Sequence, residues 1–253
     1  MCRGIIAFFS ILLFSVLAFP QLRMDNSSRH ARDSDSPSPE TSEGTASRAP
    51  VESRISAARL RVPPKVRHLF EKALHALRKQ KRVEARRDLE KALKLFPSFP
   101  EALTLSGTME MNEQQWTSAE QNLRAAIQSD PEYVRAYVVL AGLYNAQGRF
   151  DEALHTAQLA VSLGPGSWDL SYELARALIG KGEYGRALSV SDAGLRKKHG
   201  TLLHIAKAHA LAGLGSYAQA QAELRAYLRF EPSGEGVQDA RNLLNQLQQV
   251  ILR

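Results

Sequence analysis

A repeat of 34 residues runs through most of this chain, and it constrains the fold more than any other feature. Small residues mark one phase of the repeat, at spacings of 34, 34, 34 and 33: Ala85, Ala119, Ala153, Ala187 and Ala220. A second set follows seven residues later: Ala92, Ala126, Ala160, Gly194 and Tyr227. An upstream set keeps the same phase: Ala73, Gly107, Ala141, Ala175 and Ala208. Because five copies agree, the pattern predicts stacked units, none of which can bury its apolar face alone.

Each unit also carries a turn position, a ring position and an end position in a fixed order. The turn position holds Gln80, Gln114, Gly148, Gly182 and Gly215. Two residues later come Arg82, Trp116, Phe150, Tyr184 and Tyr217. The end of the unit holds Pro97, Pro131, Pro165, His199 and Pro232. Glycine suits a tight turn and proline cannot continue a helix, so each unit is predicted to be two amphipathic helices joined by a short turn. We expect the small residues to let the paired helices approach closely, and the rings to fill the gap at the top of the pair.

These positions resemble the tetratricopeptide repeat family, which has this period. The third unit carries the resemblance most closely, through Leu140, Ala141, Tyr144, Gly148, Phe150, Ala153, Ala160 and Pro165. The resemblance covers about residues 65–232, and it implies an all-α, right-handed α-solenoid of about five helix-turn-helix units. The first two units depart from the family, because polar or small residues stand where it has large apolar ones: Lys72, Ala76, Ser106 and Glu110. We expect the first helices of these two units to pack less tightly.

The last segment, residues 233–253, repeats apolar side chains at helical spacing. They are Val237, Ala240, Leu243, Leu244, Leu247, Val250 and Ile251. A solenoid needs a terminal element that covers its last apolar face, so we interpret this segment as a capping helix. The alternative is a helix that docks on a partner subunit.

The start of the chain is typical of an export signal. Arg3 precedes an apolar run over residues 5–19, and Ala18 offers a small residue for cleavage. A membrane span needs about 20 residues, so this shorter run predicts a cleaved signal peptide over residues 1–18, with an uncleaved anchor as the alternative. Residues 19–64, rich in serine and proline in their central part, are predicted to be a disordered linker. Residues 62–103 look like exported repeat proteins of the bacterial cell envelope, notably those of acidobacteria. We therefore expect an exported protein of the periplasm or cell envelope.

Motifs for catalysis, cofactors or metals are missing from the sequence. Cys2 is the only cysteine, which excludes an intrachain disulfide and a cysteine zinc site. The sequence has no phosphate-binding glycine loop, no nucleophile elbow and no helical zinc motif. His68 and His75 are two turns apart, and the spacing of His204 and His209 splays them, so neither pair predicts a metal site. We expect no cofactor and no catalytic residue. We expect instead a protein-binding scaffold, with an accessory subunit of an enzyme complex as the alternative.

In the tetratricopeptide repeat family, the first helix of each pair lines a concave groove that holds a peptide or a partner helix. By phase, the resemblance assigns twelve positions here: Phe70, Leu74, Thr104, Thr108, Met111, Arg135, Val138, Asn145, Tyr172, Arg176, Ile179 and His209. The lysine and asparagine clamp of the family's best-known variant is absent from the matching positions. Arg135 and Arg176 remain as candidate carboxylate ligands and Tyr172 as an aromatic anchor. The alternative is a groove without a specific ligand.

Charge is concentrated in the first repeat. Between residues 54 and 94 there are fourteen lysines and arginines and four acids, a net charge of +10, whereas the whole chain carries +7. Part of this excess forms a candidate patch for an anionic membrane surface: Lys79, Lys81, Arg82, Arg86 and Arg87. We expect no nucleic acid partner, because the chain is predicted to be exported and no aromatic residue is interleaved for base stacking. The alternative is an ordinary solvated helix face.

Overall fold

The computed structural model describes residues 62–251, except residues 165, 197–199 and 235. The predicted signal peptide and nearly all of the predicted linker lie outside these residues. Over the described part of the chain, the regular structure consists of eleven helices, α2 to α12. The five pairs are α2 (Pro64–Arg78) with α3 (Arg82–Leu95), α4 (Pro100–Asn112) with α5 (Trp116–Ser129), α6 (Val134–Ala146) with α7 (Phe150–Leu163), α8 (Trp168–Gly180) with α9 (Tyr184–Leu195), and α10 (Leu203–Gly213) with α11 (Tyr217–Phe230). The last helix is α12 (Val237–Ile251).

The turn inside each pair has the same backbone at the predicted position. The five turn residues lie in the left-handed region, with φ of 59° at Gln80, 60° at Gln114, 72° at Gly148, 75° at Gly182 and 79° at Gly215. Glycine adopts this conformation without steric cost, whereas an L-residue with a side chain does not. The sequence prediction of five equivalent turns is therefore confirmed, with a strained backbone in the first two units.

Small residues at the helix contacts allow the two helices of a pair to approach closely. All three predicted sets of alanines are fully buried. A Cβ atom added to Gly107 in α4 would lie 2.9 Å from Leu123 Cγ and 3.2 Å from the Ala119 carbonyl oxygen of α5. A larger residue would push the two backbones apart, which explains why the repeat keeps alanine or glycine at this phase.

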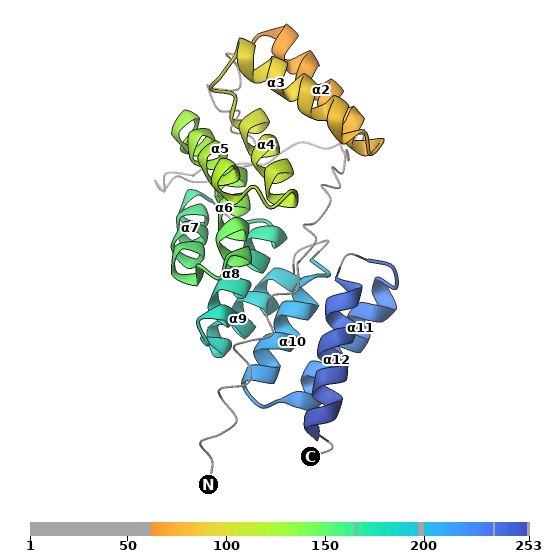
Figure 1. Ribbon diagram of the computed structural model, residues 1–253. Coiled ribbons are helices and arrows are strands. Elements are labelled where there is room, and N and C mark those ends of the chain that lie inside the picture. Colours follow the sequence, from red (N-terminus) through yellow and green to blue (C-terminus); the bar gives the residue numbers. More distant parts are fainter. Residues whose placement is uncertain (1–61, 165, 197–199, 235, 252–253) are drawn as a thin grey trace, which may run out of the picture.

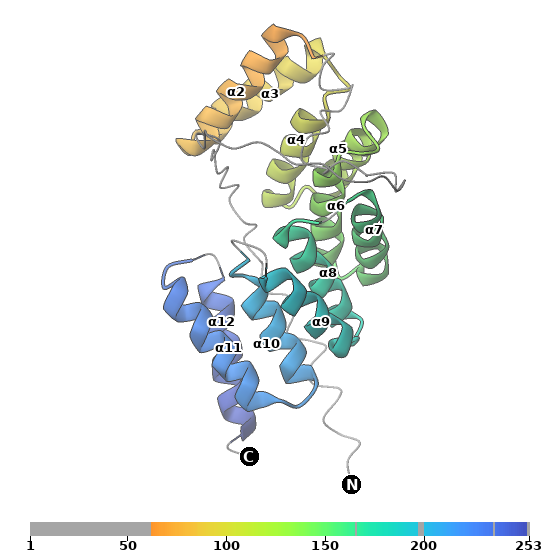
Figure 2. The ribbon, with the colours of Figure 1, turned by 180° about the vertical axis from the view of Figure 1, so that it is seen from behind.

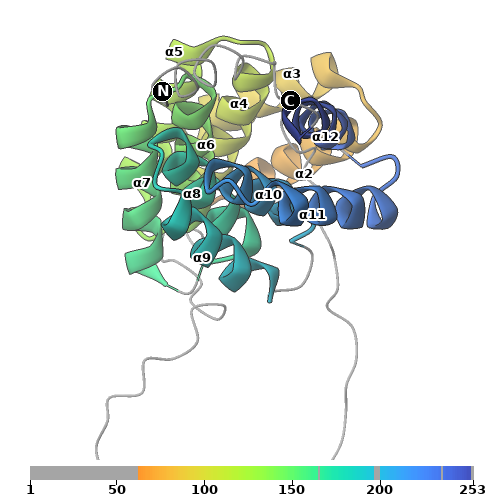
Figure 3. The same cartoon turned by 90° about the horizontal axis from the view of Figure 1, so that it is seen from below.

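The pairs stack into an elongated solenoid, with α2 and α3 at one end and α11 and α12 at the other (Figures 1 and 2). The first helices α4, α6, α8 and α10 contact one another in series and form an inner layer. Each second helix contacts the first helix of the following pair. Successive pairs rotate, so that α11 runs across the direction of α7 when the stack is seen from below (Figure 3). This arrangement confirms the predicted all-α solenoid.

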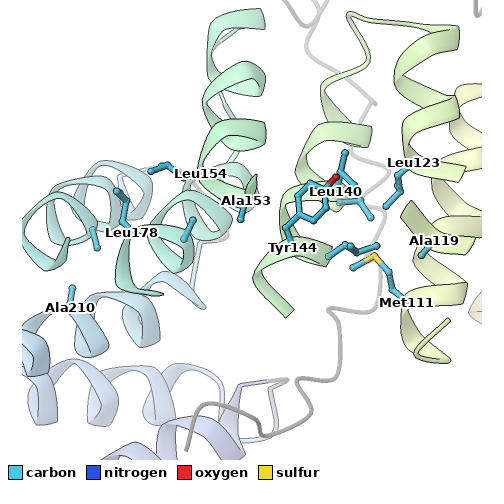
Figure 4. Packing of buried hydrophobic residues seen from close by; sticks show 13 residues of the cluster. Met111, Ala119, Leu123, Leu140, Tyr144, Ala153, Leu154, Leu178 and Ala210 are labelled. Carbon is cyan, nitrogen blue, oxygen red and sulfur yellow. The ribbon is translucent and has the colours of Figure 1, made fainter. Parts of the chain in front are cut away.

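The central hydrophobic core crosses the boundaries between units. It extends from Met111 in α4 through Leu140 and Tyr144 in α6 to Leu178 in α8 and Ala210 in α10 (Figure 4). Because these residues come from four different pairs, no pair has a complete core of its own. The burial of apolar area therefore stabilises the stack rather than any single hairpin.

A second core joins the first unit to α4, through Ala102, Leu105 and Met109 of that helix. Phe70 of α2 packs edge-on against Phe99, with ring centroids 5.1 Å apart, and Phe99 also contacts Phe96 at 6.5 Å. Polar contacts accompany the departures from the repeat pattern. Lys72 Nζ lies 4.0 Å from the buried Asp88 carboxylate. In the second unit, Asn122 donates two hydrogen bonds to the Glu110 carboxylate at 2.8 and 2.9 Å.

The helix α12 covers the open face of the last pair. Its residues Ala240, Leu243 and Leu247 are buried against a cluster that includes Leu224 and Tyr227 of α11. The predicted capping helix is thus part of the solenoid. No helix within residues 62–251 is long and apolar enough to cross a bilayer.

Candidate partner-binding surface

The inner layer brings most of the predicted groove residues to one side of the solenoid. The helix α4 supplies Thr104, Thr108 and Met111; α6 supplies Arg135, Val138 and Asn145; α8 supplies Tyr172, Arg176 and Ile179; and α10 supplies His209. Consecutive first helices contact each other, so the helices that carry these positions lie side by side across four units. Phe70 and Leu74 of α2 lie instead against the core that joins the first unit to α4.

The prediction of an open groove is wrong for four of these residues, because Thr104, Met111, Val138 and Asn145 are buried. Met111 is 1% exposed within the central core, and Val138 is 5% exposed within a cluster that includes Ala157 and Leu170. Thr104 is also buried. The first helices pack directly on one another, and this packing covers positions that face a neighbouring first helix.

Buried polar contacts connect α6 with α8 beneath the inner surface. Asn145 donates two hydrogen bonds of 2.9 Å, one to the backbone carbonyl oxygen of Glu173 and one to Glu173 Oε2. Arg176 Nη1 donates to the same Oε2 at 3.0 Å. Asn145 and Glu173 are each 6% exposed. Two polar side chains, Asn145 from α6 and Arg176 from α8, therefore converge on one carboxylate, and the bonds from Asn145 fix α6 relative to α8.

Arg176 also lies beside an aromatic ring and influences two further ionisable groups. Its guanidinium carbon lies 5.6 Å from the centroid of the Tyr172 ring, within the range of a cation–π contact. Burial and the positive charge of Arg176 lower the pKa of His209 in α10 to about 4, so this imidazole is neutral at pH 7. Burial raises the pKa of Asp239 in α12, and Arg176 opposes that rise.

Arg135 lies near the start of α6, away from this network. Its Nη1 pairs with Asp169 Oδ2 of α8 at 2.5 Å, and its side chain is 41% exposed. Both arginines that were predicted to bind a partner's carboxylate therefore already contact a carboxylate of their own chain. A partner's acidic group would have to share these guanidinium groups or displace Asp169 or Glu173.

Glu173 and Asp239 also belong to this region, although neither was among the residues predicted from the sequence. Glu173 stands three residues before Arg176, a spacing that places the two side chains together on a helix. Asp239 has no such local signal, because its proximity to Arg176 depends on how α12 packs. The resulting surface combines a tyrosine, two arginines and a neutral histidine on rigid helices. Over the described residues, no group of three or more histidine, cysteine, aspartate or glutamate side chains is placed to hold a metal ion.

A second concavity lies between α5, α6 and α7, and sequence reasoning missed it. It has a volume of about 590 Å³, and its apolar lining includes Ile127, Tyr137, Leu140, Tyr144 and Leu159. The Tyr144 hydroxyl donates to Glu120 at 2.9 Å, and Arg149 donates to the same carboxylate at 2.8 Å. Burial tends to raise the pKa of Glu120, but these hydrogen bonds outweigh it and hold the pKa below its usual range. The charged residues beside this cavity are thus paired with one another.

The predicted anionic-surface patch lies at the α2–α3 end. Lys79, Arg82 and Arg87 are exposed. Lys81 pairs with Glu84 at 2.8 Å, and Arg86 pairs with Glu113 of the following turn. The structure therefore separates this patch into three exposed cations without an ion pair and two, the exposed Lys81 and the half-buried Arg86, that are paired within the chain.

Comparison with known proteins supports the repeat and the fold. Residues 110–162 and 146–208 match the family model described as tetratricopeptide repeat. No curated protein sequence matches the chain. A thermophilic tetratricopeptide repeat protein from Thermus thermophilus is similar in structure, with a TM-score of 0.62, 19% identity, and coverage of 73% of this chain and 99% of that one.

Two further solved structures have the same fold. The type IV pilus biogenesis factor PilW has a TM-score of 0.66 at 15% identity, with 75% of this chain and 87% of that one covered. PilF of Pseudomonas aeruginosa has a TM-score of 0.59 at 18% identity, with 72% and 88% covered. At these identities the likeness concerns the fold alone.

Proposed function

We propose that this chain, a helical solenoid whose residues 110–208 match the tetratricopeptide repeat model, is a non-enzymatic scaffold that binds another protein along its inner layer. The observation that carries the proposal is the pair formed by Tyr172 and Arg176, 5.6 Å apart on the inner surface. Tyrosine and arginine are enriched among the residues that contribute most to protein–protein binding. The partner is a peptide segment or a helix that covers α6, α8 and α10.

Rigidity beneath this surface supports the same proposal. The hydrogen bonds from Asn145 to Glu173 join α6 to α8 before any partner arrives, and Arg176 holds the same carboxylate from within α8. A surface that is already ordered loses less conformational entropy on binding, so more of the contact energy appears as affinity. The exposed part of Arg135, next to Asp169, extends the polar border of the surface along α6.

We further propose that the protein works outside the cytoplasm, in the periplasm or cell envelope. The basic residue and the short apolar run at residues 3–19 support export. Amino-terminal sequencing of protein extracted from its native cells should find a mature end near Phe19. An intact Met1 on the extracted protein would reject cleavage.

Site-specific photo-crosslinking in native cells tests the binding surface. A photoreactive amino acid is placed at Thr108 or Tyr172 on the inner layer, and at Leu159 or Glu90 as exposed controls on α7 and α3. We expect a discrete adduct with one protein from the inner positions and none from the controls. If only Leu159 gave an adduct, the partner would bind at the cavity between α5, α6 and α7 and not on the inner layer.

A binding measurement with the crosslinked partner completes the test. Tyr172→Ala should weaken binding by about 2 kcal/mol, as expected for loss of a central aromatic contact. The melting temperature of the variant is measured in parallel, because Tyr172 also packs against the core cluster around Leu224. Unchanged affinity in a folded variant would contradict the proposed surface.

A further inference from the structure

The α2–α3 end of the solenoid carries a local excess of positive charge. Residues 65–94 contain eleven lysines and arginines and four acids. These residues belong to the first helix pair, which lies at one end of the stack and leans away from α4 and α5 (Figures 1 and 2). Among the described residues this pair is the first, and no described unit lies beyond it.

Ion pairs within the chain neutralise part of this charge. Lys81 and Arg86 pair with Glu84 and Glu113, and Lys72 and Lys91 lie 4.0 and 3.6 Å from the Asp88 carboxylate. Seven other exposed cations in this segment have no carboxylate within ion-pair distance among the described residues, and three of them are Lys79, Arg82 and Arg87. These three gather around the turn between α2 and α3 and the first turns of α3. Their charge is therefore available to an external anion.

An exposed aliphatic side chain lies among these three cations. Val83 is 83% exposed, more than any other large apolar residue in the described part of the chain. It follows Arg82 directly and precedes Arg87 by four residues, so Val83 and Arg87 share one face of α3. A valine side chain in contact with water adds nothing to the stability of α3 at this position. A surface with both anionic and apolar groups would bind the cations and also bury the valine side chain.

We propose that the α2–α3 end binds the surface of an anionic phospholipid bilayer. Lys79, Arg82 and Arg87 contact the phosphate groups, while Val83 enters the interfacial region between them. This surface is separate from the inner layer, so a scaffold held at a membrane keeps its partner-binding side accessible. Nucleic acid fits less well, because α2 and α3 expose no phenylalanine, tyrosine or tryptophan on which bases could stack.

The strength and salt dependence of binding follow from the number of available charges. A basic residue close to an anionic membrane contributes about 1 kcal/mol, which corresponds to about a five-fold change in the partition coefficient. Three such residues therefore give a change on the order of 100-fold at low salt. The attraction is screened at 0.5 M salt, where the Debye length is only about 4 Å.

The test is co-sedimentation of the full chain with vesicles. Vesicles of phosphatidylcholine with 30% phosphatidylserine are compared with pure phosphatidylcholine, at 0.05 M and 0.5 M salt. We expect binding to the anionic vesicles at low salt only. The triple variant Lys79→Gln/Arg82→Gln/Arg87→Gln should lose about 100-fold in partition coefficient. Val83→Gln should lose about three- to ten-fold with the charge unchanged. The apolar run near the start is common to all these proteins, so the differences report the α2–α3 end.

A matched control removes the same charge from the opposite end. Arg225, Arg229 and Arg241 are exposed on α11 and α12, and their triple glutamine variant should bind as the parent does. Equal losses in both triple variants would show a general effect of net charge and overturn the proposal.

An unaffected Val83→Gln variant, together with equally tight binding of single-stranded DNA, would identify the patch as a general polyanion site and also overturn the proposal. If the parent protein does not bind anionic vesicles at low salt, the proposal is overturned as well. Circular dichroism of each variant verifies that the helices are intact.

Discussion

The ring of Phe150, at the start of α7, lies directly against Gly180, at the end of α8. A Cβ atom added to Gly180 would lie 2.3 Å from Phe150 Cδ1, closer than any real contact. The next unit repeats the relationship, because a Cβ at Gly213 of α10 would lie 2.4 Å from the Tyr184 ring of α9. These rings therefore join consecutive units.

Gly180→Ala should destabilise the protein by about 1–3 kcal/mol, because the Phe150 ring has to move for the added methyl group to fit. The free energy of unfolding from urea denaturation measures this effect. Gly185→Ala in α9 is the matched control, since a Cβ there meets no atom within 4 Å. Alanine is the better helix former, so the control should gain about 0.5–1 kcal/mol. Equal effects at the two glycines would show that the ring contact does not constrain the stack.

The periodicity of the sequence predicted the helices, the turns and the small contact residues, because these depend on local backbone preferences and on repetition. The partner of Phe150 was not predicted, since the repeat phase does not say how far one pair rotates relative to the next. Burial of Met111 and Val138 escaped prediction for the same reason. The Glu173–Arg176 contact was readable as a spacing of three on a helix, whereas the effect of Arg176 on His209 requires the packing of α8 beside α10.

Ala153→Leu should cost about 1–3 kcal/mol of unfolding free energy, because Ala153 is fully buried where α7 meets the core. The measurement is the midpoint and slope of chemical denaturation, which separates lost stability from a change in compactness. Ala218→Leu on the exposed side of α11 introduces the same atoms and should have an effect within about 0.5 kcal/mol. Equal losses in the two variants would contradict the packing role of the repeated alanines.

Gln80→Gly or Gln114→Gly should stabilise the protein by up to about 1 kcal/mol. Both glutamines have φ near 60°, where a side chain costs about 1–2 kcal/mol and glycine returns only part of that through unfolded-state entropy. The reverse change, Gly148→Gln at φ 72°, should destabilise by a similar amount, since no atom within 4 Å of its Cβ position complicates the comparison. Thermal unfolding of the three variants measures the sign. If Gly148→Gln stabilised the protein as the two glycine variants do, the left-handed backbone would not determine the energy of these turns.

His209 should make stability depend on pH between about 4 and 6.5. Burial and Arg176 lower its pKa to about 4 in the folded chain, whereas an unfolded histidine titrates near 6.5. As the pH falls through this window, the unfolded chain takes up a proton that the folded chain does not bind, so stability falls. From pH 7.5 to pH 5, the parent should lose about 1–2 kcal/mol more unfolding free energy than His209→Gln, whose side chain does not titrate. The groups with raised pKa, Asp239 and Glu110, are present in both proteins and largely cancel in the difference. Parallel curves of unfolding free energy against pH would show that His209 titrates normally in the folded solenoid.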